Sequence, residues 1–92
     1  MQPFIIRAHE GDVVVGLEEA TPSNGSDFSI EEMNEIVGGW IELVYPSRCP
    51  DLLMVVNEEG LLKKLPGNMG ASARTGQMIV GDVLVCPKEM VK

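Results

Sequence analysis

The sequence predicts a single α+β domain, residues 1–92, with a small, mainly antiparallel sheet of five or six strands and one helix packed on one face. Three observations support this fold class. A chain of 92 residues is long enough for one domain. Short apolar and β-branched runs recur between turn signals. One segment carries both start and stop signals of a helix.

A hairpin is predicted near the N-terminus, where residues 3–8 and 12–18 have the composition of two strands. Gly11 lies in the turn between them, and glycine readily adopts the positive φ that tight hairpin turns require. Residues 21–27 contain mostly small, polar and turn-forming residues, so a loop should separate this hairpin from the helix.

The helix is predicted over residues 30–37. Ser29 and Glu32 have the spacing of a capping box, in which each side chain accepts a hydrogen bond from the other residue's backbone N–H. Met33 and Val37 lie on one apolar stripe. Gly38 should end the helix, because glycine takes the left-handed conformation at little cost.

Two further strands are expected directly after the helix. Residues 40–45 alternate between two faces, as a half-buried strand does, whereas residues 52–56 are apolar on both faces, as in a central strand. Residues 57–60 should form a type I turn closed by a left-handed glycine. Residues 61–65 should then run back antiparallel.

The remaining segments are predicted to contain one more strand. Residues 66–72 are expected to be irregular, and residues 74–76 to form a tight turn. The last strand should cover residues 78–86, with Gly81 at a bulge or a close backbone approach. The tail over residues 87–92 should fray.

The charge is acidic and uneven. Fourteen acidic side chains against seven basic ones give a net charge of −7, and most of the acids lie between residues 10 and 59. Phosphate backbones are bound by clustered Lys and Arg, so double-stranded nucleic acid is not an expected partner. An acidic face complements a basic protein surface, or simply keeps a small protein soluble. No apolar run reaches the roughly 18 residues of a membrane helix, so no membrane partner is expected.

Cys49 and Cys86 lack the spacing of a zinc or redox motif. They are predicted to be free thiols of a cytoplasmic protein, although a disulfide between them depends on geometry. With His9 as the only histidine, neither a metal site nor a cofactor is expected.

Two groups of residues are candidate binding sites. Cations, glycines and small polar residues gather between residues 63 and 75, where backbone N–H groups can bind the anion of a phosphorylated ligand. Acidic residues around Trp40 suit a basic partner, with Trp40 as an anchor, although the pattern favours Trp40 as a core residue. The ligand-binding candidates are Lys63, Lys64, Asn68, Ser72, Arg74 and Thr75, and the partner-binding candidates are Glu31, Glu35, Trp40, Glu42, Glu58 and Glu59.

The order of several short motifs resembles a known family. A capped helix ends in Val37-Gly38-Gly39, Trp40-Ile41-Glu42 follows, and Asn57-Glu58-Glu59-Gly60, Leu65-Pro66-Gly67-Asn68 and Ile79-Val80-Gly81-Asp82 come in that order. This arrangement, over about residues 29–86, resembles domain-of-unknown-function family 3846 of phages and bacterial mobile elements. The resemblance implies that setting and transfers no activity.

These observations lead us to expect a non-enzymatic accessory protein of a phage or mobile element that docks on a host protein through its acidic surface. The alternative is a protein that sequesters a phosphorylated small molecule or nucleotide, as an antagonist of host defence. A small enzyme ranks third, because the sequence pairs no nucleophile with a general base. The limited core also favours a homo-oligomer.

Overall fold

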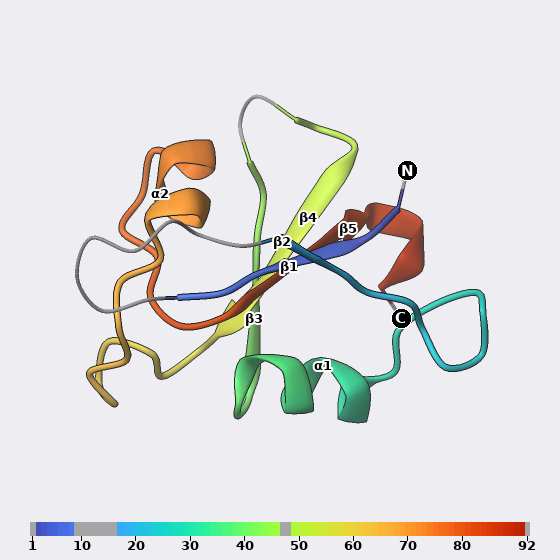
Figure 1. Ribbon diagram of the computed structural model, residues 1–92, viewed down its shortest axis with the longest axis horizontal. Coiled ribbons are helices and arrows are strands. Elements are labelled where there is room, and N and C mark those ends of the chain that lie inside the picture. The colour runs from blue at the N-terminus through green and yellow to red at the C-terminus, as the bar shows by residue number, and fades with distance from the viewer. Residues whose placement is uncertain (1, 9–16, 47–48, 92) are drawn as a thin grey trace.

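A computed structural model describes residues 2–8, 17–46 and 49–91 of the chain. Within them it has the predicted α+β class, with five strands, two α-helices and a short 3-10 helix (Figure 1). The strands are β1 (Phe4–Ile6), β2 (Leu17–Glu19), β3 (Ile41–Val44), β4 (Leu52–Asn57) and β5 (Val83–Pro87), and the helices are α1 (Ile30–Val37), α2 (Met69–Thr75) and η1 (Lys88–Met90).

The five strands form one antiparallel sheet in the order β2-β1-β5-β4-β3. The predicted N-terminal hairpin is confirmed as the β1–β2 pair, in which Ile5 lies opposite Glu18. β1 is shorter than the predicted 3–8 strand, and β2 covers the end of the predicted 12–18 strand and one residue beyond it. The predicted turn with His9 and Gly11 and the start of the second predicted strand lie outside the described residues. β2 and β3 form the two edges of the sheet, and β4 and β5 lie towards its centre.

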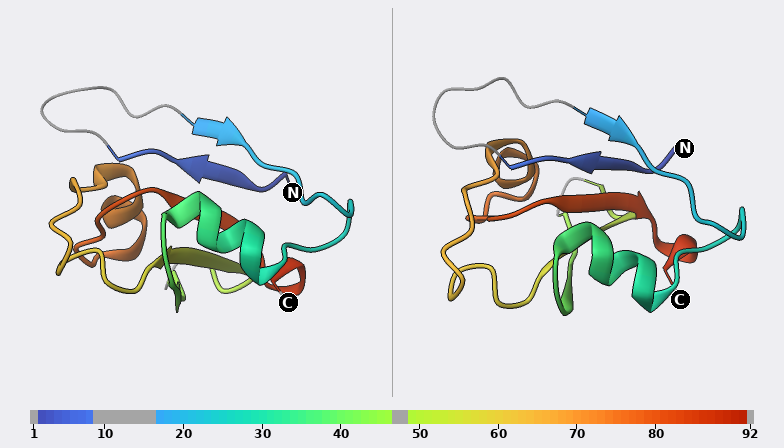
Figure 2. Two further views of the ribbon diagram at one scale, coloured as in Figure 1. Left: turned by 90° about the horizontal axis from the view of Figure 1, so that it is seen from below. Right: turned by 60° about the horizontal axis from the view of Figure 1, so that its bottom comes forward.

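Helices cover both faces of the sheet (Figure 2). Met33 of α1 packs on one face together with Val55 and Leu84. Ala71 of α2 lies in a second cluster with Val56 and other residues of the opposite face, since successive residues of a strand point to opposite sides. The single predicted helix is therefore joined by a second one, and the apolar 52–56 segment is confirmed as a central strand.

Helix α1 has the bounds that the capping signals predict. The Ser29 Oγ accepts a hydrogen bond from the Glu32 N–H at 3.1 Å, and the Glu32 Oε1 accepts one from the Ser29 N–H at 3.0 Å. Gly38 has a φ of 80° and donates its N–H to the Asn34 carbonyl. Local sequence is sufficient here because every signal lies within one turn of the helix ends.

Helix α2 corrects two predictions, the irregular segment over residues 66–72 and the tight turn over residues 74–76. Asn68 caps this helix by accepting a hydrogen bond from the Ala71 N–H at 3.0 Å. Gly76, with a φ of 72°, ends the helix. The signal is weak in the sequence because Gly70, inside the helix, lowers helix propensity.

The predicted strand over residues 61–65 is wrong. The segment forms successive turns, in which the Lys63 N–H donates to the Glu59 carbonyl at 2.9 Å and the Leu65 N–H donates to the Gly60 carbonyl at 3.1 Å. The physical reason is the sheet order. β4 already has β3 on one side and β5 on the other, so a returning strand finds no free edge beside it.

Close packing explains two glycines of this half. Gly60 was predicted to have a left-handed backbone, but its φ is not in that region. In this segment Lys64 is left-handed instead, with a φ of 54°. A Cβ at Gly60 would instead lie 2.7 Å from the Val80 side chain. Gly81 has a φ of 78°, and a Cβ there would lie 2.8 Å from Leu65, which confirms a close approach at this position.

The C-terminal end differs from its prediction in two ways. The left-handed backbone of Gly81 interrupts the predicted 78–86 strand, so β5 begins only two residues later. The tail was predicted to fray, but it is ordered up to residue 91. The Phe28 N–H donates to the Met90 carbonyl at 2.8 Å. This bond fastens η1 to the segment that enters α1.

Candidate functional site

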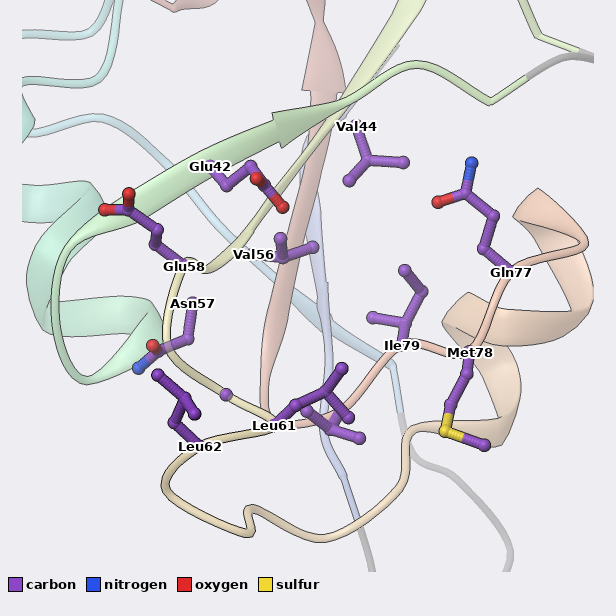
Figure 3. Close-up of a pocket in the computed structure, with 12 residues that line it drawn as sticks. Glu42, Val44, Val56, Asn57, Glu58, Leu61, Leu62, Gln77, Met78 and Ile79 are labelled. Carbon is purple, nitrogen blue, oxygen red and sulfur yellow. The ribbon is translucent and has the colours of Figure 1, made fainter.

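A groove of about 370 Å³ lies on the α2 face of the sheet, beside the edge strand β3 (Figure 3). Val44 of β3 and Val56 of β4 line it from the sheet. The turn after β4 and residues 77–80, which lead from α2 towards β5, supply its other walls. Because β3 is the last strand of the sheet, the groove lies beside a sheet edge that no further described strand covers.

Exposed apolar side chains gather around this groove. Leu61, Leu62 and Met78 are 67%, 82% and 77% exposed. Single exposed apolar residues are ordinary on protein surfaces, whereas a contiguous group of them is typical of interaction sites, so this groove is a candidate. A strand over residues 61–65 would not have exposed both leucines, so sequence reasoning missed them. The sequence did contain a signal for them: Leu61 and Leu62 directly follow the turn residues 57–60, where apolar side chains are unusual.

Two carboxylates stand on the same side of the groove. Glu42 belongs to β3, and Glu58 directly follows β4 (Figure 3). The pairing of the two strands brings them together, because the Glu58 N–H donates to the Trp40 carbonyl at 2.9 Å. Within the described part of the chain neither carboxylate forms an ion pair. The groove therefore combines apolar surface with two carboxylates that form no ion pair in the described ranges.

Trp40 lies on the surface, which corrects the prediction that favours it as a core residue. Its side chain is 65% exposed, at the point where the chain leaves α1 and enters β3. The predicted alternation is confirmed over residues 41–44, which form β3, whereas Trp40 and Tyr45 of the predicted 40–45 strand lie outside it. The remaining role foreseen for Trp40, contact with a partner, stays a prediction.

The acidic candidates do not form one surface. Glu42 and Glu58 line the groove, and Glu59 follows in the same turn. Glu31 and Glu35 are exposed on α1, which covers the opposite face of the sheet. The structure thus separates a groove pair, Glu42 and Glu58, from a helix pair, Glu31 and Glu35, and the two pairs carry the same charge.

Asn68, a candidate for ligand binding, is a buried structural residue. Its side chain is shielded from solvent, with 1% of the residue exposed. The Nδ2 donates to the Ile6 and Gly81 carbonyls, both at 2.9 Å, while Oδ1 caps α2. Both ends of the Asn68 amide are thus occupied by hydrogen bonds within the protein, and the side chain is not accessible to a ligand.

The other ligand-binding candidates lie on α2 and in the turn after β4. The Ser72 Oγ accepts a hydrogen bond from the backbone after α2, and so does the Thr75 Oγ1. Arg74 donates to a carbonyl of its own helix at 2.9 Å. Lys63 and Lys64 are exposed. The hydroxyls thus serve the fold, and a phosphate site formed by the cations stays a prediction.

A second charged cluster braces the edge opposite β3. Arg7 forms ion pairs with Glu18 and with Asp82, both at 2.8 Å. The hydrogen bond from Arg7 lowers the pKa of Glu18. These contacts join β1 to β2 and to the residue before β5, so the cluster has a structural role.

The two cysteines are not bonded to each other in the structure. Cys49 is exposed and Cys86 is buried, and both are free, as predicted. Burial, followed by the charge of Glu89, raises the pKa of the Cys86 thiol to about 11, so this thiol is unreactive at neutral pH. Among residues 2–8, 17–46 and 49–91, no three His, Cys, Asp or Glu side chains are grouped to hold a metal.

Fold and site together define a class: a small α+β domain with an open, acid-flanked groove at the edge of an antiparallel sheet. None of the helices seen in the described ranges is long and apolar enough to cross a membrane. The chain belongs to the family "Domain of unknown function (DUF3846)", which matches residues 6–90 and so extends beyond residues 29–86 at both ends. No curated protein and no solved structure matches it.

Proposed function

We propose that this chain is a non-enzymatic, cytoplasmic accessory protein of a phage or mobile element, and that its groove binds a basic, partly apolar segment of a host protein. One observation carries the proposal. Exposed apolar side chains share one hollow, at an open edge of the sheet, with Glu42 and Glu58, which form no ion pair with any described residue.

Charge selects the sign of the partner. An unpaired carboxylate gains little from any single exposed ion pair, but a net charge of −7 steers a cationic partner towards the protein. Affinity must come mainly from apolar contact, at about 25 cal/mol for each Å² removed from water. Leu61, Leu62 and Met78 offer that contact beside the carboxylates.

The chemistry of the groove supports binding over catalysis. The described residues that line it include no histidine, cysteine, serine or threonine. A nucleophile with an adjacent base is therefore absent from this lining, although two carboxylates are present. An anionic phosphorylated ligand would be repelled by Glu42 and Glu58, so that alternative needs the cations Lys63, Lys64 and Arg74.

A lysine-containing peptide tests the proposal. We expect a labelled peptide with alternating Lys and Val or Leu residues to bind, with a dissociation constant measured by fluorescence anisotropy. The double variant Glu42→Gln/Glu58→Gln should weaken binding about tenfold, since each exposed ion pair contributes up to about 1 kcal/mol. Added salt should weaken binding to the unmodified protein, because salt screens exposed charges.

The helix pair gives a matched control. Glu31→Gln/Glu35→Gln removes the same charge from the opposite face of the sheet and should change the dissociation constant less than about twofold. Equal losses in the two double variants would show attraction by net charge alone. An unbound peptide would contradict the proposal. A nucleotide that stabilises the protein, and ceases to do so in Lys63→Ala/Arg74→Ala, would favour the sequestering function instead.

A further inference from the structure

We infer that the bound segment adds to the sheet as an extra antiparallel strand along β3, and that it carries a Lys or Arg between two apolar residues. This inference rests on the proposed function and specifies the conformation and residue pattern of the partner. It follows from the direction of the backbone groups of β3, from the side chains on its two faces, and from the charge beside it.

The register of β3 determines which of its backbone groups face outward. The Trp40 carbonyl accepts from the Glu58 N–H on the neighbouring strand, and Ile41 lies opposite Asn57. In an antiparallel pair the residues that exchange hydrogen bonds alternate with those that do not. The N–H and C=O groups of Glu42 therefore face β4, and those of Ile41 and Leu43 face away from it.

These outward groups lie at an open edge. β3 is the last strand of the sheet, and no hydrogen bond joins the Ile41 or Leu43 backbone to another residue in the described ranges. Unpaired backbone groups along an edge strand form a template for a further strand. Two residues of β3 offer two donors and two acceptors to an extended segment.

The side chains of β3 specify the pattern of that segment. Residues directly opposite each other in an antiparallel pair lie on the same face of the sheet. Glu42 faces the groove, whereas Leu43, 36% exposed, faces the α1 side. A partner residue opposite Glu42 belongs to a pair without hydrogen bonds, in which side chains approach more closely. A Lys or Arg there meets the carboxylate and lays its long apolar stem along the groove beside Leu61 and Met78. Its two apolar neighbours face the α1 side, beside Ile41 and Leu43.

The charge of the chain argues against a second copy as the occupant. Two copies would each bring a net charge of −7, and each would bring Glu42 to the shared edge. Like charges directly opposite each other on neighbouring strands are destabilising. A basic segment from another protein has the complementary charge.

Two N-methylated peptides provide the test. The two apolar residues that flank the Lys point their N–H groups at β3, whereas the Lys itself points its N–H at solvent. Methylation of the two flanking amides should weaken binding about tenfold, because it removes two hydrogen bonds of about 0.7 kcal/mol each. Methylation of the Lys amide and of the amide two residues further on should change the dissociation constant less than about twofold.

A variant of β3 tests the same bonds from the protein side. Leu43→Pro removes an outward N–H and keeps the β3–β4 hydrogen bonds, since proline is tolerated where a strand N–H faces solvent. Its matched control is Leu43→Ala, which removes the same side chain. We expect the proline variant to bind at least about threefold more weakly than the alanine variant. Circular dichroism checks the fold, and the methylated peptides decide the question if the proline variant does not fold.

The outcomes separate this inference from the function on which it rests. Trp40, the sole tryptophan, adjoins β3 and reports peptide addition by a blue shift of its emission. Equal affinity of the two methylated peptides would overturn strand addition and leave groove binding intact. An unbound parent peptide would overturn both. A dimer in light scattering that is lost in Leu43→Pro would show that a second copy takes this edge.

Discussion

Asn68 shows how much one buried side chain contributes. Its amide reaches the carbonyl of Ile6 on β1, the carbonyl of Gly81 before β5, and the N–H of Ala71 in α2. Three separate parts of the chain are thereby held at one point under the second helix. An apolar residue of similar size removes the hydrogen bonds that two buried carbonyls accept from this amide, and lost hydrogen bonds to buried groups are costly.

Asn68→Ala should lower the free energy of unfolding by about 2–4 kcal/mol, the combined cost of a lost N-cap and of two lost hydrogen bonds to buried carbonyls. Urea denaturation measures this change. Asn24→Ala is the control, because Asn24 also bonds neighbouring groups but lies exposed in the 21–27 loop. Equal losses in the two variants would contradict the bracing role of Asn68.

At the scale of the element, the start of α1 depends on the carboxylate of Glu32. Hydrogen bonds from the backbone N–H groups of Ser29 and Ser23 lower the pKa of Glu32 below its ordinary value of 4.5. A carboxyl group whose pKa is lowered on folding stabilises the folded state above its unfolded pKa. That stabilisation is lost as the pH falls through the folded pKa.

The difference in stability between the unmodified protein and Glu32→Gln should therefore shrink as the pH falls from about 6 to about 3. Urea denaturation at several pH values measures it. Glu31→Gln is the control, because it removes the same charge from the first turn of α1. No described N–H group donates to the Glu31 side chain, so its effect should not include the loss of such hydrogen bonds. A difference between the protein and Glu32→Gln that stays constant over this pH range would refute the role of the capping box.

At the scale of the molecule, the excess of negative charge should act on folding and on the proposed binding in opposite directions. A net charge of −7 on a small globule repels itself, so the compact state should gain stability when salt screens the charges. The same screening should weaken the proposed attraction between the groove and a basic segment. The salt concentration should therefore change the folding stability and the binding affinity in opposite directions.

The midpoint of thermal unfolding should rise when NaCl increases from about 10 mM to about 150 mM, while the affinity for the lysine peptide falls. Choline chloride is the control, because it provides the same ionic strength with a cation that carboxylates bind weakly. A midpoint that falls with either salt would show that attractive ion pairs, such as that of Arg7, outweigh the repulsion.

The candidate site was predictable only in part. The acidity of Glu42 and Glu58 and the isolated Trp40 are visible in the sequence. Their meeting at one edge required the β3–β4 register, and the apolar rim required that Leu61 and Leu62 lie in a turn. These facts depend on contacts between strands, which residue spacing along the chain does not determine.

The sequence by itself determined helix α1 and the central strand β4, because each depends on signals within a few residues. The α+β class and the antiparallel pairing of β1 with β2 were also predicted, from the pattern of short strands. Tertiary structure decided the second helix, the turns over residues 61–65 and the late start of β5. In each case a distant partner prevailed over local preference: the carbonyls that Asn68 reaches, the occupied edges of β4, and the close contact of Gly81 with Leu65.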